Sequence, residues 1–434
     1  MFLETKEHII KNFDRLATSQ LRKQALLIAE AGFGAINTTD AILEQAKYDE
    51  KKHQLVIQNK KFDLSRYKKI ICLGIGKAAL EAATAFYRIL GNKISRGFVI
   101  DVKEGFINEK IICRAGTHPL VSEQNINYTK EALSFLEDLT KDDLVIFIVS
   151  GGGSALFELP FEITAEKQAE IFKALTKQGA NIKELNTVRK HISLVKGGQL
   201  AKKIYPASLI SLVFSDVPGD DLSMVASGPS LKDSTTAREA QAVLEKYKVA
   251  QTLNLSSIKL VETPKEEKYF INTQNFLIVS PAQALLAMRE KAEELGFKVE
   301  VFSKNYQGEA RKLSAQIIQA AKAKGCLLGA GESSVIIKGN GTGGRNQEMA
   351  LAALPSISEN QVFIALASDG RDNTEAAGAI VDESTIQRAK NLGLDPQQYL
   401  ENNDSFTFFE AVGDAVMTGL TGSNVADFFV YLKK

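Results

Sequence analysis

A run of glycines between two serines, SGGGS at residues 150–154, directly follows the apolar run at 144–149. Glycines accept positive φ and bring backbone N–H groups close to a ligand, because no Cβ stands in the way. The apolar, β-branched run predicts a buried central strand, and open α/β sheets bind anions in the turns at the carboxyl ends of their strands. A tight structural turn would also need small residues, but five such residues after a buried strand favour an anion cradle. The residues expected to hold a phosphate or carboxylate are Ser150, Gly151, Gly152, Gly153 and Ser154.

A second glycine turn, GIGKAA at 74–79, follows a short predicted strand at 69–73 and precedes a predicted helix. Gly74 and Gly76 have the spacing of a dinucleotide-binding turn, which is a weak signal, and Asp101 lies farther along than a ribose-binding acid usually does. Lys77 places a cation at a helix N-terminus, where the helix dipole favours an anion. An anion between the lysine and the helix resolves this conflict. We therefore expect Lys77 to contact a phosphate or carboxylate, the alternative being a solvated lysine at a helix start.

An Asp-rich turn, SDVPGDD at 215–221, follows another predicted strand at 209–214. Mg²⁺ in proteins commonly takes one or two carboxylates together with phosphate oxygens, which fits Asp220 and Asp221. Asp216 is a candidate catalytic residue because a carboxylate at this position could orient or deprotonate a hydroxyl group. The alternative is a structural turn whose aspartates cap backbone amides.

The second half of the chain contains its own glycine-rich segment, GNGTGGRNQE at 339–348. Gly343 and Gly344 precede Arg345 at the expected start of a helix, which again describes an anion site. Arginine adds planar, bidentate recognition of phosphate or carboxylate, and a flexible hairpin tip is the less favoured alternative. Glycine turns, aspartates and two cations together suit phosphoryl transfer, in which catalysis is mostly positioning and charge neutralisation. The same set would also bind a small hydroxy acid.

Alternating predicted strands and helices run through both halves of the chain and indicate an α/β fold with two layered domains and largely parallel sheets. We expect a Rossmann-like N-terminal domain at 1–255 and a smaller C-terminal α/β domain at 270–434. The polar, patternless segment at 251–270 is the predicted linker. Residues 1–48 read as helical, with an interruption near Gly32 and Gly34. The predicted C-terminal elements include separate strands at 326–328 and 334–338 and a last strand at 427–432.

The composition is that of a globular protein of ordinary polarity. Of its 434 residues 44% are hydrophobic and 24% charged, and the formal net charge is +1. This balance favours neither nucleic acid nor a membrane surface as a partner. The three cysteines are widely spaced, which fits a reducing cytoplasm better than a disulfide framework or a zinc cluster. We expect a cytoplasmic protein without a signal peptide, either a monomer or a homodimer.

Seven motifs in order resemble the class II glycerate kinases, the glycerate 2-kinases with a C-terminal MOFRL domain. They are GIGKAA, SGGGSALFELP, LNTVRKHISLVKGGQLA, SDVPGDDLSMVASGP, GGRNQEMALA, SDGRDNTEAAGA and TGLTGSNVADF. The resemblance covers nearly the whole chain. It implies ATP-dependent phosphorylation of D-glycerate to 2-phosphoglycerate with Mg²⁺ or another divalent cation, in a cleft between two α/β domains. It also implies that Lys77 and Arg345 are the active-site lysine and arginine.

Further residues of these motifs are expected to contact ligands. Glu332 joins the aspartates as a metal-ligand candidate. The substrate candidates are Arg189, Lys196, Asp369 and Asn424. The chain departs from the family pattern at His118, whose loop lacks the usual second proline and aspartate, so that a ligand role for this loop is left open. Two other functions also remain open: an NAD(P)H-dependent hydroxypyruvate reductase, a label that members of this family have carried, and a non-catalytic metabolite-binding protein.

Overall fold

The computed structural model describes residues 8–215, 221–321, 324–423 and 425–434 of the chain. By their contacts, these residues form two units. Unit 1 combines residues 8–40 with Val279–Lys434, and unit 2 comprises residues 41–215 and Asp221–Ile278. This division differs from the expected boundary at 251–270. The strand at Thr273–Val279 joins the sheet of unit 2, and the N-terminal helices pack on the sheet of unit 1.

The main sheet of unit 2 has six strands in the order β6-β5-β4-β7-β8-β9. These strands are β6 (Ile111–Ala115), β5 (Arg96–Asp101), β4 (Lys69–Ile75), β7 (Asp143–Val149), β8 (Ser208–Phe214) and β9 (Thr273–Val279). The pairs β6–β5, β5–β4, β4–β7 and β7–β8 are parallel, as expected. Every residue of β7 is buried, which confirms the predicted central strand.

The strand order of this sheet reverses between β4 and β7. From β4 the chain proceeds to β5 and β6 on one side, and then returns to place β7 on the other side. In open α/β sheets, ligands bind at such a switch point, beside the carboxyl ends of the strands. The GIGK turn (Gly74–Lys77) includes the last two residues of β4, and the SGGGS turn (Ser150–Ser154) follows β7. Both predicted anion turns therefore meet at the switch point.

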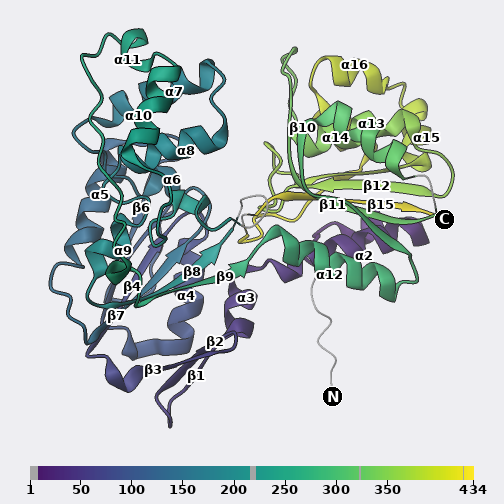
Figure 1. The fold of residues 1–434 in the computed structure, drawn as a ribbon. Helices are drawn as coiled ribbons and strands as arrows, with labels where there is room; N and C mark the ends of the chain where they lie inside the picture. Colours follow the sequence, from purple (N-terminus) through teal and green to yellow (C-terminus); the bar gives the residue numbers. More distant parts are fainter. Residues whose placement is uncertain (1–7, 216–220, 322–323, 424) are drawn as a thin grey trace. The chain divides into compact units, whose positions relative to one another are not determined.

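Helices cover the parallel sheet, and some form a separate cluster at one end of unit 2 (Figure 1). The helices are α3 (Thr38–Gln45), which crosses the unit boundary, α4 (Ala79–Leu90), α5 (Glu123–Ser134), α6 (Gly153–Leu156), α7 (Ala165–Lys177), α8 (Ile182–His191), α9 (Gln199–Ile204), α10 (Ala237–Lys246) and α11 (Val249–Thr252). Helices α7, α8, α10 and α11 share a second apolar core, apart from the core of the sheet. A small antiparallel sheet that the sequence pattern did not reveal contains β1 (Ala46–Asp49), β2 (Gln54–Ile57) and β3 (Lys60–Asp63).

The sheet of unit 1 is mixed, in the order β10-β11-β15-β12-β13-β14. Its strands are β10 (Val299–Glu309), β11 (Gly325–Ser334), β15 (Asp427–Lys433), β12 (Gln361–Leu366), β13 (Gly378–Asp382) and β14 (Ala415–Val416). Only the pairing of β10 with β11 is parallel among the pairs described, so the expectation of a largely parallel sheet is wrong for this unit. Parallel neighbours need a long crossover, whereas β12 and β13 are joined without a helix.

Helices lie on both faces of this mixed sheet, with α2 and α12 on one face and α13 and α14 on the other (Figure 1). The helices of unit 1 are α1 (Phe13–Leu16), α2 (Gln20–Ala35), α12 (Pro281–Glu294), α13 (Ala310–Ala320), α14 (Arg345–Ala353), α15 (Glu383–Asn391), α16 (Pro396–Glu401) and α17 (Ser405–Val412). Helix α2 continues through both Gly32 and Gly34, where an interruption was expected. The two short strands expected at 326–328 and 334–338 are replaced by the single strand β11.

A buried arginine fixes the N-terminal helix α2 to the C-terminal part of unit 1. Arg22 is fully buried and donates hydrogen bonds from Nη1 to Asp382 Oδ1 at 3.0 Å and from Nη2 to Asp414 Oδ1 at 2.5 Å. Its Nε donates to the carbonyl oxygen of Leu16 at 2.8 Å. A buried charge is tolerated when it is paired and hydrogen-bonded. This network explains why the N-terminal helices belong to unit 1.

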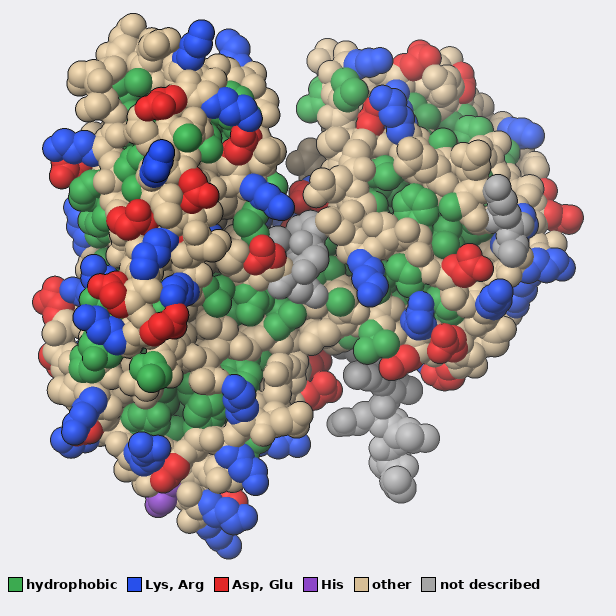
Figure 2. Space-filling view, in the orientation of Figure 1, with side chains coloured by type: hydrophobic (Ala, Val, Ile, Leu, Met, Phe, Trp, Pro, Cys, Tyr) green, Lys and Arg blue, Asp and Glu red, His purple; other side chains and the backbone are tan. Residues whose placement is uncertain are grey.

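Lys and Arg side chains are interspersed with Asp and Glu on the face drawn in Figure 2. Within the described residues, no single helix has the length and apolar composition needed to span a membrane, although α2 and α3 meet that criterion when taken together.

Candidate functional site

The GIGK and SGGGS turns of unit 2 are in direct contact. Ser150 N donates to the carbonyl oxygen of Ile75 at 3.0 Å, and Lys77 N donates to that of Gly151 at 2.9 Å. Gly76 has φ +114°, and a Cβ at this position would lie 2.2 Å from Ser150 Oγ. The close approach of the two turns therefore requires a glycine at position 76.

The ammonium group of Lys77 is unpaired within the part of the chain that the structure describes, since it has neither a hydrogen bond nor an ion pair there. The Lys77 side chain runs beside Gly152, where a Cβ would lie 3.1 Å from Lys77 Cγ. The backbone amides of Gly152 and Ser154 also have no acceptor among the described residues. An unpaired cation beside two free N–H groups is an arrangement that binds a phosphate or carboxylate.

His118 lies over the same glycine, since a Cβ on Gly152 would be 3.2 Å from His118 Cδ2. Burial lowers the pKa of His118, and the nearby charge of Lys77 lowers it further. The imidazole is thus held in its neutral form at a position beside the lysine. The sequence left the role of this loop open, and the structure places it next to the SGGGS turn.

The N-terminus of α4 is occupied by groups of the chain itself. Leu80 N donates to Asp101 Oδ2 at 2.9 Å, and Ala78 N donates to Ser150 Oγ at 3.1 Å. In a dinucleotide-binding turn, these helix N–H groups would face the pyrophosphate. Asp101 is instead a buried cap whose pKa is raised by its burial. This geometry disfavours a dinucleotide bound at the N-terminus of α4.

The two basic substrate candidates of unit 2 occupy different environments. Lys196 is fully buried and donates to the carbonyl oxygens of Gly153 at 3.1 Å and Phe157 at 2.5 Å. Burial lowers the pKa of Lys196 to about 8. Lys196 therefore holds the segment after the SGGGS turn in place from within the core. Arg189 packs its guanidinium 4.6 Å from the ring centroid of Phe172 and lines a cavity of about 850 Å³ that also includes Ser154.

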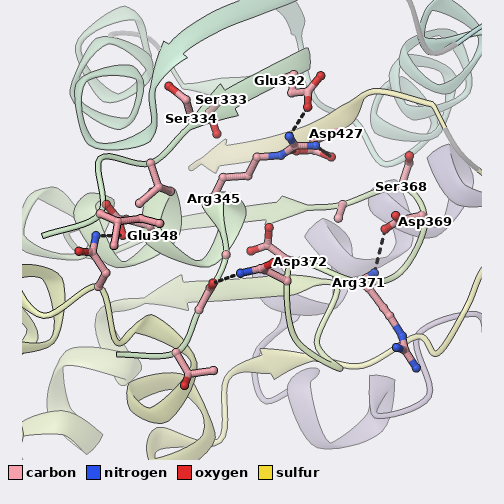
Figure 3. Close-up of a pocket in the computed structure, with 18 of the residues that line it drawn as sticks. Glu332, Ser333, Ser334, Arg345, Glu348, Ser368, Asp369, Arg371, Asp372 and Asp427 are labelled. Carbon is pink, nitrogen blue, oxygen red and sulfur yellow. Dashed lines mark hydrogen bonds and ion pairs between the residues drawn. The ribbon is translucent and has the colours of Figure 1, made fainter. Parts of the chain in front are cut away.

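The candidate site of unit 1 is a polar pocket of about 730 Å³ around Arg345 (Figure 3). Arg345 donates from Nε to Asp427 Oδ2 at 2.6 Å and from Nη2 to Asp427 Oδ1 at 3.2 Å. Its Nη1 donates to Glu332, whose side chain is 59% exposed. The bidentate geometry expected for a ligand is thus made with a carboxylate of the chain itself.

The N-terminus of α14 is capped by Asp372. Asn346 N donates to Asp372 Oδ1 at 3.2 Å and Gln347 N donates to Asp372 Oδ2 at 2.7 Å. A Cβ on Gly344 would lie 2.0 Å from the carbonyl oxygen of Asp372, and one on Gly343 would lie 2.1 Å from Ser405 Oγ. Close packing against the backbone therefore requires a glycine at position 344, whereas Gly343 is packed against a side-chain hydroxyl. The helix N–H groups that were expected to face phosphate face Asp372.

The carboxylates of this pocket have unusual acidities. Burial raises the pKa of Asp427 to about 7, and the nearby Asp372 raises it too, whereas Arg345 lowers it. Burial also raises the pKa of Asp372. Perturbed carboxylates beside an arginine are typical of functional sites, although structural ion pairs also produce them. Neither carboxylate was singled out as a site residue from the sequence; the signal for Asp427 was a charged residue at the start of an apolar strand.

The remaining candidates are only partly described. Asp216, Asp220 and Asn424 lie outside the described residues. Asp221 is exposed and accepts a hydrogen bond from Ser223 N at 3.0 Å. Asp369 lines the pocket of unit 1 and accepts from Arg371 N at 3.0 Å. Among the residues with described positions, no three His, Cys, Asp or Glu side chains are grouped as a metal site.

Comparisons with known proteins agree with this arrangement over most of the chain. Residues 24–262 match a domain of unknown function, DUF4147, and residues 325–427 match the MOFRL family. A D-glycerate 2-kinase of Thermotoga maritima is 40% identical over 84% of this chain and 90% of its own length. A glycerate 2-kinase of Pyrococcus horikoshii is 38% identical over 93% of this chain and 96% of its own length.

A solved structure and a differently named relative complete the comparison. The crystal structure of a glycerate kinase from Thermotoga maritima superposes with a TM-score of 0.80 and 36% identity, covering 94% of this chain and 98% of the other. A putative hydroxypyruvate reductase of Agrobacterium vitis is 34% identical over 83% of this chain and 86% of its own length. The order of the motifs, the matched domains and the shared fold agree, and the chain therefore belongs to the MOFRL family of glycerate 2-kinases.

Proposed function

We propose that the protein catalyses the ATP-dependent phosphorylation of D-glycerate to 2-phosphoglycerate, with a divalent cation bound together with the nucleotide. The observation that carries this proposal is the ammonium of Lys77 beside the amides of Gly152 and Ser154, all three without a partner among the residues that the structure describes. A fixed cation and oriented N–H groups neutralise the charge of a transferring phosphoryl group. The glycerate 2-kinases among the relatives support the choice of substrate.

Lys77, Arg345 and Asp216 have separate roles in the proposed reaction. Lys77 binds phosphate oxygens from the SGGGS side of unit 2. Arg345 stabilises the negative charge of the phosphoryl group or of the hydroxy acid, and Asp427 fixes the plane of its guanidinium. Among the described residues, Glu332 is the partner of Arg345 Nη1, and this exposed side chain has to move for a ligand anion to reach Nη1. Asp216, outside the described residues, is the proposed residue for orienting the hydroxyl group.

A divalent cation fits the available carboxylates only as an ion that comes with the nucleotide. Mg²⁺ typically takes phosphate oxygens and one or two protein carboxylates, and it would supply charge neutralisation of the phosphates. Asp221 is exposed, and among the described residues only its Oδ1 accepts a hydrogen bond, which leaves Oδ2 for such an ion. We therefore propose Asp221 and Asp220 as the residues that hold it, and Glu332 as a further candidate.

The decisive experiment incubates the protein with D-glycerate and MgATP and measures ADP release in a coupled assay. Enolase added to the reaction consumes 2-phosphoglycerate directly, whereas 3-phosphoglycerate requires a mutase first, so the two products are distinguished. We expect enolase-dependent product without mutase. The hydroxypyruvate reductase alternative predicts instead NADH loss with hydroxypyruvate and no ADP, and this result would overturn the proposal. Ligand binding without either turnover would indicate a metabolite-binding protein.

A further inference from the structure

The two cavities differ in chemistry, although each contains an arginine. The pocket of unit 1 has charged and hydroxyl side chains around Arg345, together with a smaller number of apolar ones such as Val335, Ile337 and Val425. The surface of the unit 2 cavity, of about 850 Å³, is mostly apolar, although charged side chains also line it. The apolar residues come from the loop after β6, from α6 and from α7, namely Leu120, Val121, Ala155, Ala169 and Phe172. The charged residues are Glu158, Glu166, Glu170, Lys173, Lys177 and Arg189.

The two proposed ligands, glycerate and ATP, also differ in polarity. Glycerate has three carbons, each bearing oxygen, and has no group that gains from an apolar cavity of this size. ATP combines a charged triphosphate with a flat, largely apolar heterocycle, and ligand pockets for such groups are apolar with a few oriented polar side chains. The cavity therefore matches the nucleotide.

The position of the cavity fits a ligand with a charged end. Ser154 lines it, and the Ser154 amide, which has no acceptor among the described residues, belongs to the predicted anion-binding turn beside Lys77. A molecule with phosphates at the SGGGS turn can thus extend its apolar part along Ala155 into the cavity. At the other side, Arg189 is fixed by its contact with Phe172 and by a hydrogen bond from Nη1 to Asn186 Oδ1 at 3.2 Å. The wall is preorganised at this point.

From this geometry we infer that the cavity between the SGGGS turn and α7 binds the adenine ring and ribose of ATP. The inference rests on the proposed kinase function and assigns unit 2 to the nucleotide. The polar pocket of unit 1, with Arg345, then receives the carboxylate and hydroxyl groups of glycerate.

Gln168 of α7 provides the polar recognition of the base. It is 1% exposed and lines the cavity, and neither its amide nitrogen nor its amide oxygen has a partner among the described residues. A buried amide without partners is costly, and adenine offers a donor and an acceptor side by side on one edge. Both amide atoms are covered by neighbouring atoms, so this pairing requires the Gln168 side chain to turn toward the base.

The test fills the cavity in the full-length protein. Ala169→Phe places a ring in it, and the matched control Ala250→Phe changes a similarly half-buried helical alanine that lines a different cavity of unit 2. Calorimetry measures the binding of MgADP, and steady-state kinetics gives KM for ATP and for D-glycerate. We expect Ala169→Phe to weaken MgADP binding and raise KM for ATP at least tenfold, with KM for glycerate changed less than twofold. The control should match wild type in both.

Binding of inorganic tripolyphosphate, which has no base, shows whether a variant has lost only the base site or has lost its fold. It should persist in Ala169→Phe and disappear in Lys77→Ala. Gln168→Leu should weaken MgADP about tenfold without affecting tripolyphosphate. Wild-type affinity of Ala169→Phe for MgADP, in an enzyme that phosphorylates glycerate, would overturn this inference and leave the proposed function intact. Conversely, loss of MgADP binding in that variant of a protein with no glycerate turnover would refute the function alone.

Discussion

Asp427 holds the guanidinium of Arg345 by two hydrogen bonds, at 2.6 Å to Nε and 3.2 Å to Nη2, so that the arginine presents its remaining Nη1 edge to an exposed carboxylate. The more deeply buried partner therefore positions the arginine, whereas Glu332 occupies the place that a ligand anion would take. Arg345 is ordered before any ligand binds, and the predictions for this pocket follow from that arrangement.

Arg345→Lys keeps the charge but removes the planar group that bonds both Asp427 oxygens. We expect kcat to fall at least tenfold, about 1.4 kcal/mol of transition-state stabilisation, because a lysine cannot reproduce the bidentate geometry. Initial rates at saturating ATP and D-glycerate measure this. An unchanged kcat would remove Arg345 from the mechanism. Arg371→Lys, at the edge of the same pocket, is the matched control and should retain wild-type kcat.

Asp427→Asn should change the pH dependence of stability. The pKa of Asp427 is raised to about 7 by burial. Its contribution to stability is therefore fully present below about pH 4, the ordinary aspartate value, and is lost as the pH rises through 7. The asparagine does not ionise, so the unfolding free energy of the variant minus that of wild type should increase from about pH 4 to pH 7. Urea titrations across this range test it, and a flat difference would show that Arg345 keeps Asp427 ionised throughout.

Glu332→Gln removes the carboxylate that competes for Arg345 Nη1. The Glu332 side chain is 59% exposed, so its interaction is screened and the effect should be modest. We expect KM for D-glycerate to fall about two- to threefold, because surface ion pairs contribute less than about 1 kcal/mol. The Mg²⁺ concentration needed for half-maximal rate decides whether Glu332 is also a metal ligand, and an unchanged value would exclude it. A higher Mg²⁺ requirement would instead assign Glu332 to the metal.

Lys196→Met should disturb the SGGGS segment without touching a ligand. The substitution removes the Lys196 donor from the carbonyl oxygen of Phe157 and one of the two donors from that of Gly153, which still accepts from Phe157 N. The expected cost is about 1–3 kcal/mol of unfolding free energy, the typical penalty for unsatisfied buried polar groups. Chemical denaturation measures it, and kcat should fall with it because the turn is no longer fixed. A variant as stable as wild type would show that these contacts are unimportant.

Gly344→Ala should be strongly destabilising, because a Cβ would lie 2.0 Å from the carbonyl oxygen of Asp372. We expect a loss of about 2 kcal/mol or more, in the range for overpacked sites. Gly34→Ala is the matched control within unit 1, since no neighbouring atom lies within 4 Å of the point where its Cβ would stand and the residue belongs to helix α2. That variant should gain about 0.5–1 kcal/mol from helix propensity. Thermal unfolding of the two variants compares them directly, and equal stabilities would contradict the packing explanation.

Local patterns predicted much of the fold. The apolar run at 144–149 became β7, and the strands before the GIGK and Asp-rich turns were placed within a few residues. Such elements can be predicted because their apolar runs and the turn residues that follow them are adjacent in the sequence. The position of β15 between β11 and β12, and the pairing of α2 with a C-terminal sheet, depend on contacts far apart in the sequence. No local pattern encodes such contacts.

The site shows the same limit. The glycine turns at strand ends were predicted from spacing alone, but some of their glycines serve close packing of the chain and not ligand binding. Gly76 and Gly344 allow the chain to approach itself, and the helix N–H groups beside them are taken by Asp101 and Asp372. A sequence motif cannot distinguish a carboxylate of the protein from one of the ligand, because both are bound by the same N–H groups.

The two carboxylates that neutralise Arg22 follow it late in the sequence: Asp382 comes 360 residues after it and Asp414 comes 392 residues after it. During synthesis, helix α2 thus leaves the ribosome with a cation that has no counterion until nearly the whole polypeptide has emerged. Unit 2 can finish folding in that interval, whereas unit 1 closes last. A truncation that removes the final strand and its neighbours should therefore leave the first helices as a chaperone or protease target, even where the intervening unit is intact.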